Sequence, residues 1–278
     1  MRTVSAAKVS RAVRDLCMQV NRHLPEDVRR ALEEAARREE KPAAREVLAQ
    51  LLKNCALAAS TGLPLCQDTG MAVLFVTLGQ DLKVDGDLTA AIQEGVRAGY
   101  AQGFLRASIC RPFSRENTGD NTPAVVHYDI APGDRLRIAL LAKGGGAENM
   151  SRVTVLSPSA GWEGIMDFSL NRLAEARSNP CPPVILGLGI GGSLEQAAIL
   201  AKKALLRPLD DRHADADLAD KEAELLERIN ALGLGPMGLG GKCTCLGVKI
   251  LASPCHIASL PLAVNIQCHS SRHAQVEI

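Results

Sequence analysis

The stretch Val184-Ile185-Leu186-Gly187-Leu188-Gly189-Ile190-Gly191-Gly192-Ser193 decides the fold class. It begins with an apolar run of strand length, Val184–Leu188, which is typical of a strand buried on both faces. Gly191-Gly192-Ser193 then marks a turn and the start of a helix that is expected to reach Leu206, because Pro208 ends it. A buried strand followed directly by a helix predicts an α/β fold.

The segments around this stretch complete the predicted architecture. Residues 1–62 read as helices, and the apolar face of the first consists of Val9, Val13, Leu16, Cys17 and Val20. Further helices are expected over about Pro42–Ala59, Asp87–Gly103, Trp162–Ala176 and Leu218–Leu232. Strands are expected over Met71–Leu78, Val248–Leu251 and Leu262–Ile266, with a hairpin of Val125–Ile130 and Leu136–Leu141. We therefore predict one α/β domain over 1–278, with a helical segment 1–62 and a mixed α/β core 63–278 that carries catalytic loops at the ends of its elements.

The composition excludes several classes of protein. With 278 residues, 46% of them hydrophobic, the chain can bury a full core and is not disordered. A formal charge of +1 and only one Trp, two Tyr and four Phe give neither the field nor the stacking surfaces that nucleic acid requires. No apolar run reaches the roughly 20 residues of a membrane helix, and the amino terminus lacks the layout of a secretory signal. We expect a cytoplasmic protein with neither nucleic acid nor membrane as a partner.

The glycines from Gly187 to Gly192 match the spacing found in dinucleotide-binding folds. Asp210 and Asp211 lie at the distance expected of the acidic residue that binds the ribose, which in such folds ends a second parallel strand. Residues 209–221 are polar throughout instead. A tight strand-to-helix turn, with a helix N-terminus able to bind an anion, therefore explains the glycines better.

Nine cysteines, an odd number, argue against a disulfide scaffold and for thiols, some of them metal ligands. Cys66, Cys181 and Cys268 stand out because they lie in loops beside Asp, Pro-Pro or His. Three thiolates from distant loops suit an iron-sulfur cluster held at three corners, whose open iron acts as a Lewis acid. The other cysteines are expected to be small buried or incidental thiols: Cys17, Cys55, Cys110, Cys243, Cys245 and Cys255.

A zinc site near the carboxyl terminus is the alternative. Its ligands would come from Cys243, Cys245, Cys255-His256, Cys268-His269 and His273. None of these has the two-residue spacing of a zinc ribbon. Spacing alone leaves both a cluster and a zinc-binding structural module open, and it assigns no role to Cys243 and Cys245.

The loop motifs taken together are more specific than any one of them. They are Cys66-Gln67-Asp68-Thr69-Gly70, Glu116-Asn117-Thr118-Gly119, Asn121-Thr122-Pro123, Ala142-Lys143-Gly144-Gly145-Gly146, Asn179-Pro180-Cys181-Pro182-Pro183, Gly240-Gly241-Lys242 and Asn265-Ile266-Gln267-Cys268-His269. In this order they resemble the alpha subunit of class I fumarate hydratase, an iron-sulfur hydro-lyase family that also contains L-tartrate dehydratase. The resemblance covers nearly the whole chain from the first helix onward.

This resemblance implies a [4Fe-4S] cluster ligated by Cys66, Cys181 and Cys268, with the fourth iron open to substrate. It makes Asp68 the catalytic residue that transfers a proton. The substrate-binding residues that it implies are Gln67, Asp68, Arg106, Lys143, Gly146 and His256. His256 follows Cys255 here, where many relatives have an Arg.

The implied activity is the reversible hydration of fumarate to (S)-malate, a step of the tricarboxylic acid cycle. Single-chain relatives have a second domain that supplies further arginines, a lysine and a threonine base, and this chain has no counterpart of it. The resemblance therefore implies a smaller beta subunit, in an α2β2 assembly, that completes the active site. Residues 142–149 resemble the fumarase form more than the tartrate form, so fumarate is the preferred substrate and an L-tartrate dehydratase alpha subunit is the alternative.

Overall fold

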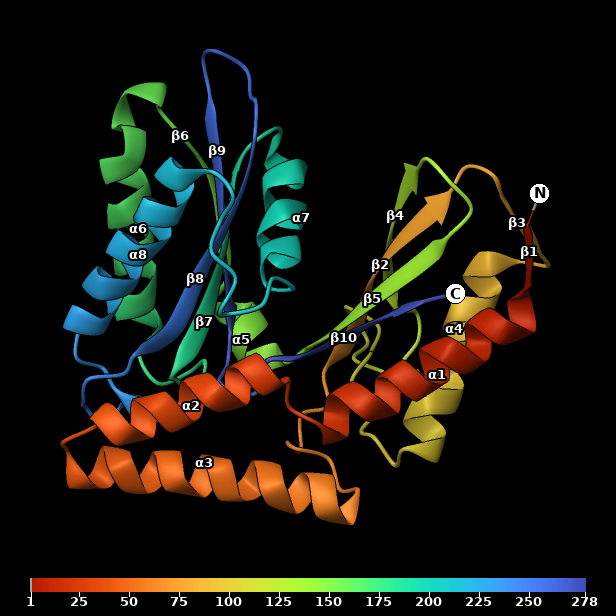
Figure 1. Ribbon diagram of the computed structural model, residues 1–278, viewed down its shortest axis with the longest axis horizontal. Coiled ribbons are helices and arrows are strands. Elements are labelled where there is room, and N and C mark those ends of the chain that lie inside the picture. The colour runs from red at the N-terminus through yellow and green to blue at the C-terminus, as the bar shows by residue number, and fades with distance from the viewer. Residues whose placement is uncertain (1) are drawn as a thin grey trace. The chain divides into compact units, whose positions relative to one another are not determined.

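The computed structural model describes residues 2–278 and contains two compact units, each built around its own sheet (Figure 1). The first unit comprises the chain up to Pro25, Cys55–Gly145 and Arg272–Ile278, and the second comprises Glu26–Asn54 and Gly146–Ser271. The predicted α/β class is confirmed. The units do not coincide with the expected helical segment 1–62, because helix α1 (Ala6–Arg22) belongs to the first unit and α2 (Glu26–Arg38) to the second.

The first unit has a four-stranded mixed sheet in the order β10-β5-β2-β4. Its strands are β2 (Met71–Gly79), β4 (Val125–Ala131), β5 (Leu136–Lys143) and β10 (Arg272–Glu277), and a parallel pair is added by β1 (Arg2–Ser5) and β3 (Leu82–Asp85). Helices α1 and α4 (Leu88–Gln102) pack together beside this sheet (Figure 1). The apolar face predicted for α1 is confirmed, because all five of its residues are at most 3% exposed and pack in one core with Leu74 and Val76 of β2.

The expected hairpin is wrong in its pairing. β4 and β5 follow each other in the chain, but β2 lies between them, parallel to β4 and antiparallel to β5. The turn at Gly133 forms as expected, yet it carries the chain past the end of β2, where Asp81 donates to the Gly133 carbonyl at 2.9 Å. β2 takes the central position because its residues 72–76 are buried on both faces, whereas Ile130 of β4 is 76% exposed.

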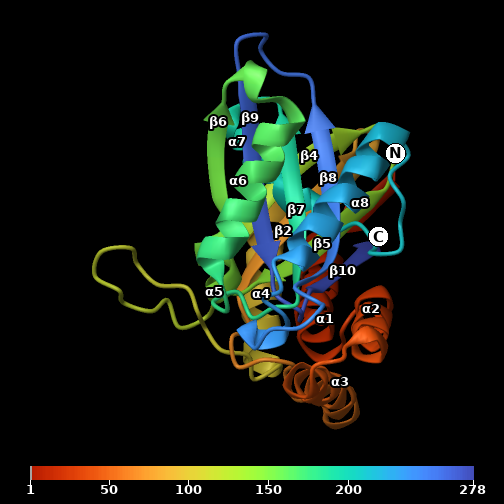
Figure 2. The ribbon, with the colours of Figure 1, turned by 90° about the vertical axis from the view of Figure 1, so that its left-hand side faces the viewer.

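The second unit has a four-stranded sheet in the order β6-β9-β7-β8. Its strands are β6 (Arg152–Leu156), β7 (Val184–Gly191), β8 (Cys245–Ser253) and β9 (Leu260–Gln267). Helix α7 (Leu194–Ala204) covers one face, and α6 (Gly161–Ala176) and α8 (Ala216–Ala231) lie on the other (Figures 1 and 2). The short helix α5 (Gly145–Met150) precedes β6, and α3 (Pro42–Thr61) has residues in both units.

Two glycines inside β7 explain the apparent dinucleotide motif. A Cβ on Gly189 would lie 1.9 Å from the Ala197 carbonyl oxygen, and one on Gly187 would lie 2.2 Å from that of Ala201. These glycines therefore let α7 approach the strand closely, and the turn itself is formed by Gly191 and Gly192. The segment after α7 forms no strand before α8, so the second strand of a dinucleotide fold does not exist here.

Among residues 2–278, no helix combines the length and hydrophobicity that crossing a membrane requires.

The contact between β7 and α7 gives a stability prediction. A Gly189→Ala substitution is expected to lower the free energy of unfolding by about 1–3 kcal/mol, because the added methyl group must displace the α7 backbone. Urea unfolding measures the change. The control is Ala252→Val, at an exposed position of β8 that pairs with Ile190 of β7. Its free energy of unfolding should stay within about 0.5 kcal/mol of the parent's. Equal effects of the two substitutions would contradict this packing.

Candidate functional site

The predicted catalytic residue Asp68 lies in a turn directly before β2. Its carboxylate accepts hydrogen bonds from the Gly70 amide at 3.0 Å and from the Gly145 amide at 2.8 Å. The second contact follows from the sheet register, because Met71 pairs with Lys143 and so places the start of β2 beside the end of β5. Asp68 and Cys66 are half-buried and Gln67 is exposed. The turn thus fixes the Asp68 carboxylate and leaves the Gln67 side chain exposed to solvent.

Buried polar side chains form hydrogen bonds with the backbone carbonyl oxygens of this turn. The Tyr100 hydroxyl contacts the carbonyl oxygens of Thr69 at 3.0 Å and Gly70 at 2.9 Å. Burial raises the pKa of Tyr100, so its hydroxyl stays a neutral donor. Arg272 donates through Nη1 to the Asp68 carbonyl at 2.7 Å and to Asn21 Oδ1 at 3.0 Å. The backbone of the Asp68 turn is therefore fixed by two helices and by β10.

Sequence reasoning missed Tyr100, Asn21 and Arg272. Each left a weak signal: Asn21 is a polar residue on the apolar face of α1, and Tyr100 lies on the buried face of α4. Arg272 comes four residues after Cys268. None of these signals indicates by itself which loop the side chain reaches.

Asn121 ties Arg106 to the same turn. Its Nδ2 donates to the Gly70 carbonyl at 3.2 Å, and its Oδ1 accepts from the Ser108 amide at 2.7 Å. Thr69 adds a second link, because its hydroxyl donates to the Arg106 carbonyl at 3.0 Å. The Arg106 side chain is exposed. The backbone of Arg106 therefore lies beside the turn that carries Gln67 and Asp68.

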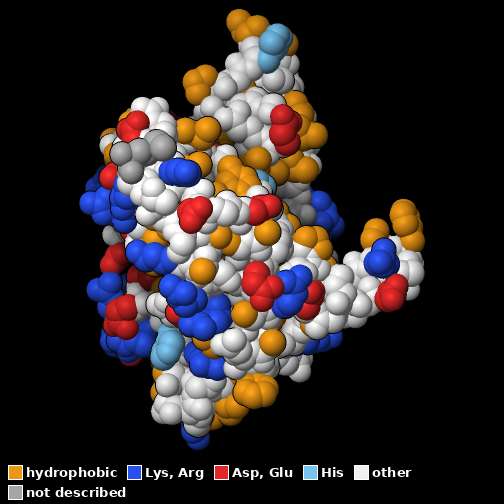
Figure 3. Space-filling view, turned by 90° about the vertical axis from the view of Figure 1, so that its right-hand side faces the viewer, with side chains coloured by type: hydrophobic (Ala, Val, Ile, Leu, Met, Phe, Trp, Pro, Cys, Tyr) orange, Lys and Arg blue, Asp and Glu red, His pale blue; other side chains and the backbone are white. Residues whose placement is uncertain are grey.

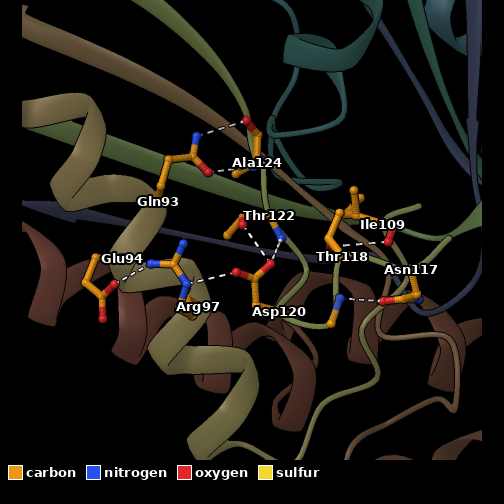
Figure 4. A network of polar contacts seen from close by, with 10 residues as sticks. Gln93, Glu94, Arg97, Ile109, Asn117, Thr118, Asp120, Thr122 and Ala124 are labelled. Carbon is orange, nitrogen blue, oxygen red and sulfur yellow. Dashed lines mark hydrogen bonds and ion pairs between the residues drawn. The ribbon is translucent and has the colours of Figure 1, made fainter. Parts of the chain in front are cut away.

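The loop from Arg106 to Thr122 is built on a polar network at its base (Figure 4). Asp120 accepts from Arg97 Nε at 2.8 Å and from the hydroxyl and amide of Thr122 at 2.7 and 2.9 Å. The loop stands away from the rest of this unit (Figure 2) and carries apolar side chains towards its end (Figure 3), where Phe113 is 97% exposed. The motif residues at 116–123 thus brace the loop that follows Arg106.

Lys143 and Gly146 lie on either side of the boundary between the units. Lys143 ends β5 in the first unit, and only 1% of it is exposed, so it is not a solvated surface lysine. Gly146 is an exposed residue of the second unit, and a Cβ there would lie 3.2 Å from the Asn179 carbonyl oxygen. Gly146 therefore adjoins the loop that carries Cys181.

Cys181 and Cys268 lie in neighbouring loops of the second unit. His269 Nδ1 is 3.0 Å from the Cys181 carbonyl oxygen, as the pairing of Ile185 with Gln267 at this end of the sheet requires. Cys181 is exposed and has φ of 55°, a left-handed conformation that non-glycine residues adopt only at an energetic cost. Such strain is concentrated at functional sites. The geometry therefore supports a common role for these two cysteines.

His256 does not lie with these cysteines. It is in the exposed loop between β8 and β9, where its Nδ1 accepts from the Ala258 amide at 3.1 Å. The residues between His256 and Cys268 are mostly those of β9, and a strand advances about 3.3 Å per residue. His256 is thus at the opposite end of this sheet, and its short separation from Cys268 in sequence is misleading.

Cys243 and Cys245 are the cysteines of the alternative zinc site. Burial raises the pKa of each thiol to about 12, as it does for Cys17, so both are neutral thiols at neutral pH. Both line a largely apolar cavity of about 460 Å³. Within residues 2–278, neither unit by itself gathers three Cys, His, Asp or Glu side chains around a metal-sized space. Cys66 belongs to the first unit, and Cys181 and Cys268 belong to the second.

The network around Asp120 gives a prediction for acid stability. Hydrogen bonds from the Thr122 hydroxyl and amide and from Arg97 lower the pKa of Asp120 to about 2. Because this is below the ordinary value of about 4, the carboxylate contributes its full stabilisation above pH 4 and loses it as the pH falls towards 2. Asp120→Asn should therefore be less stable than the parent at pH 7, and the difference should narrow between pH 5 and pH 2.

Urea unfolding across this pH range measures the difference. Arg97→Gln, which removes one of the donors, should show a smaller version of the same effect. A difference between parent and Asp120→Asn that is constant with pH would show that the carboxylate does not depend on these contacts.

The chain is similar in sequence to proteins of one enzyme family. The family model described as fumarate hydratase (Fumerase) matches residues 10–277. A Methanocaldococcus jannaschii protein named "Putative L(+)-tartrate dehydratase subunit alpha" is 41% identical over 274 residues, which cover 96% of each chain. The L(+)-tartrate dehydratase subunit alpha of Escherichia coli K12 is 32% identical over 269 residues, or 95% of this chain and 89% of the relative. This chain therefore belongs to the fumarate hydratase family of hydro-lyases, which includes proteins named as tartrate dehydratase alpha subunits.

Proposed function

We propose that this chain is the alpha subunit of an iron-sulfur hydro-lyase that adds water to, or removes it from, a four-carbon dicarboxylate. The preferred substrate pair is fumarate and (S)-malate. The observation that carries the proposal is the fixed Asp68 turn, which presents an acid together with Gln67 and Arg106 and directly follows Cys66. Membership of the hydro-lyase family supports the reaction class.

The residues present fit a [4Fe-4S] cluster held by Cys66, Cys181 and Cys268. Thiolates are the usual ligands of such clusters, and three of them leave one iron for substrate. Two structural features support the assignment: the strained, exposed Cys181 lies beside the Cys268 loop, and the buried guanidinium of Arg272 contacts the turn that follows Cys66. A bound cluster would supply a Lewis acid for the substrate hydroxyl.

The chain's own residues would bind and protonate the substrate. Arg106 would hold one carboxylate, and Gln67 would donate to a hydroxyl or carboxylate oxygen, because both side chains are exposed. Asp68 would exchange a proton with the substrate, because its two anchored oxygens each keep a free lone pair beside the accepted amide. Lys143 is a buried cation whose backbone lies beside Gly70, and Gly146 would allow close approach of the substrate to the backbone.

A partner subunit is part of the proposal. The relatives are named as alpha subunits, which supports a beta subunit that completes the active site. We propose an α2β2 assembly that acts in the cytoplasm and in the tricarboxylic acid cycle. The alternative substrate, L-tartrate, is supported by the relatives' names.

The cofactor assignment predicts the metal content of the complex. After anaerobic isolation with its beta subunit, each chain should contain about four irons and as many acid-labile sulfides. Cys66→Ser should lose most of both, because a hydroxyl is a poor ligand for the cluster. Cys255→Ser, an exposed cysteine outside the proposed ligand set, is the control and should keep them. Zinc without sulfide, or full iron content in Cys66→Ser, would contradict the assignment.

The role of Asp68 predicts a loss of turnover without loss of cofactor. Asp68→Asn should lower kcat by about 10²–10⁴-fold, the usual contribution of a general acid or base, and should leave the iron content unchanged. Asp81→Asn, at an exposed position of the same unit, should behave like the parent. If Asp68→Asn keeps the parent's kcat, Asp68 does not transfer the proton.

The same assays decide the substrate. The values of kcat/KM of the parent complex for fumarate, (S)-malate and L-tartrate should favour the fumarate and malate pair. A clear preference for L-tartrate would replace fumarate by tartrate and keep the hydro-lyase assignment.

A further inference from the structure

Arg272 is a buried cation without a charged partner. Only 1% of it is exposed, which makes it one of the largest fully buried side chains. Its acceptors are both neutral: the Asp68 carbonyl at 2.7 Å and Asn21 Oδ1 at 3.0 Å. Its Nε has no hydrogen-bond partner. Within residues 2–278, Arg272 forms no direct ion pair with an Asp or Glu.

Burial of the Arg272 guanidinium lowers the stability of the fold unless an anion compensates its charge. A guanidinium loses its hydration on burial, and buried charges in proteins are therefore normally paired. Tyr100 cannot compensate it, because burial keeps that hydroxyl protonated. Asp68 forms no direct ion pair with Arg272, although its Oδ2 lies near Arg272 Nη2 across Gly144. The hydrogen-bond acceptors of the buried guanidinium are therefore only neutral groups.

Gly144 lies between Arg272 and Asp68. A Cβ there would be 3.5 Å from Arg272 Nη2 and 3.1 Å from Asp68 Oδ2, so a side chain would crowd the Asp68 carboxylate. Because the guanidinium is almost fully buried, a solute that exchanges with solvent is a poor match for it. A resident anionic group at the adjacent Cys66–Asp68 turn is a better one.

We propose that Arg272 supplies the positive charge that compensates the thiolate-ligated iron-sulfur core at the Cys66–Asp68 turn, and that it thereby stabilises the bound cluster and raises its reduction potential. This inference rests on the proposed function. Three thiolates give the core a net negative charge, and net charge and nearby donors set both its stability and its potential. Arg272 is therefore a positioning residue for Asp68 and a charge partner for the cofactor.

The test compares variants of the anaerobic complex by iron retention and reduction potential. Arg272→Gln removes the charge but keeps a donor for the Asp68 carbonyl. It should bind iron about 10–100-fold more weakly against a chelator, the usual effect of losing such a partner, and should lower the potential. Arg272→Lys keeps the charge and should retain iron better than Arg272→Gln. Arg2→Gln is the matched control, because Arg2 also donates to two carbonyls of this unit, those of Asp134 and Ile278.

Asn21→Asp tests the same idea with Arg272 intact. The substitution is isosteric and places a carboxylate against the guanidinium, so it should neutralise Arg272 and lower the potential of the cluster. This variant carries the test if Arg272→Gln does not fold. Parent-like iron retention and potential in Arg272→Gln or in Asn21→Asp, with only a changed Tm, would overturn the proposal and leave Arg272 as a structural brace.

Equal defects in Arg272→Lys and Arg272→Gln would also overturn it, because charge would then not be the relevant property. A parent complex without iron would instead refute the proposed function. The failure of the inference and the failure of the function are therefore separate outcomes.

Discussion

The hydrogen bonds from the Gly70 and Gly145 amides to the Asp68 carboxylate are the constraint on which the candidate chemistry depends. The Gly70 contact is local to the turn, whereas the Gly145 contact exists because β2 and β5 pair in the register that sets Met71 opposite Lys143. The same register requires Gly70, whose Cβ would lie 2.8 Å from the Lys143 backbone. The central strand β2 therefore builds the core and also carries Asp68, the exposed Gln67 and Cys66 in the turn at its amino end.

Neutral side chains and one cation donate hydrogen bonds to the backbone of this turn. Tyr100 and Asn121 fix backbone carbonyls without adding charge. Arg272 contacts the same turn and brings a charge that its neutral acceptors leave uncompensated. In the second unit, Cys181 has a strained backbone and lies beside the Cys268 loop. These features are the structural basis of the cluster that we propose.

Sequence reasoning worked where a local pattern reports burial directly. The apolar face of α1 and the strands β2 and β7 were predictable because their periodicity reflects contacts with one core. Sequence reasoning failed where several strands compete to pair with the same neighbour in a sheet. Two consecutive strands suggested a hairpin, but β2, being the most buried, separates them. β10 was not predicted, because its residues 273–277 are partly buried or exposed and show no apolar run.

The same distinction applies to the candidate site. Asp68, Gln67 and the three cysteines were suggested by motifs that resemble a family, whereas Tyr100, Asn21 and Arg272 reach the Asp68 turn from elements far away in the sequence. His256 and Cys268 lie at opposite ends of β9, because this strand carries the chain the length of the sheet. Sequence distance indicates proximity within a loop or a helix, but not across a strand.

The central claim is that this chain holds an iron-sulfur cluster with one iron open to substrate. Mössbauer spectroscopy of the anaerobic complex, enriched with the Mössbauer isotope of iron, tests it most directly when spectra are compared with and without a four-carbon dicarboxylate. The account predicts that about one iron in four changes its signal when the dicarboxylate binds, because three cysteines leave one iron without a protein ligand. A cluster whose irons all keep the same signal in the presence of substrate would contradict the claim.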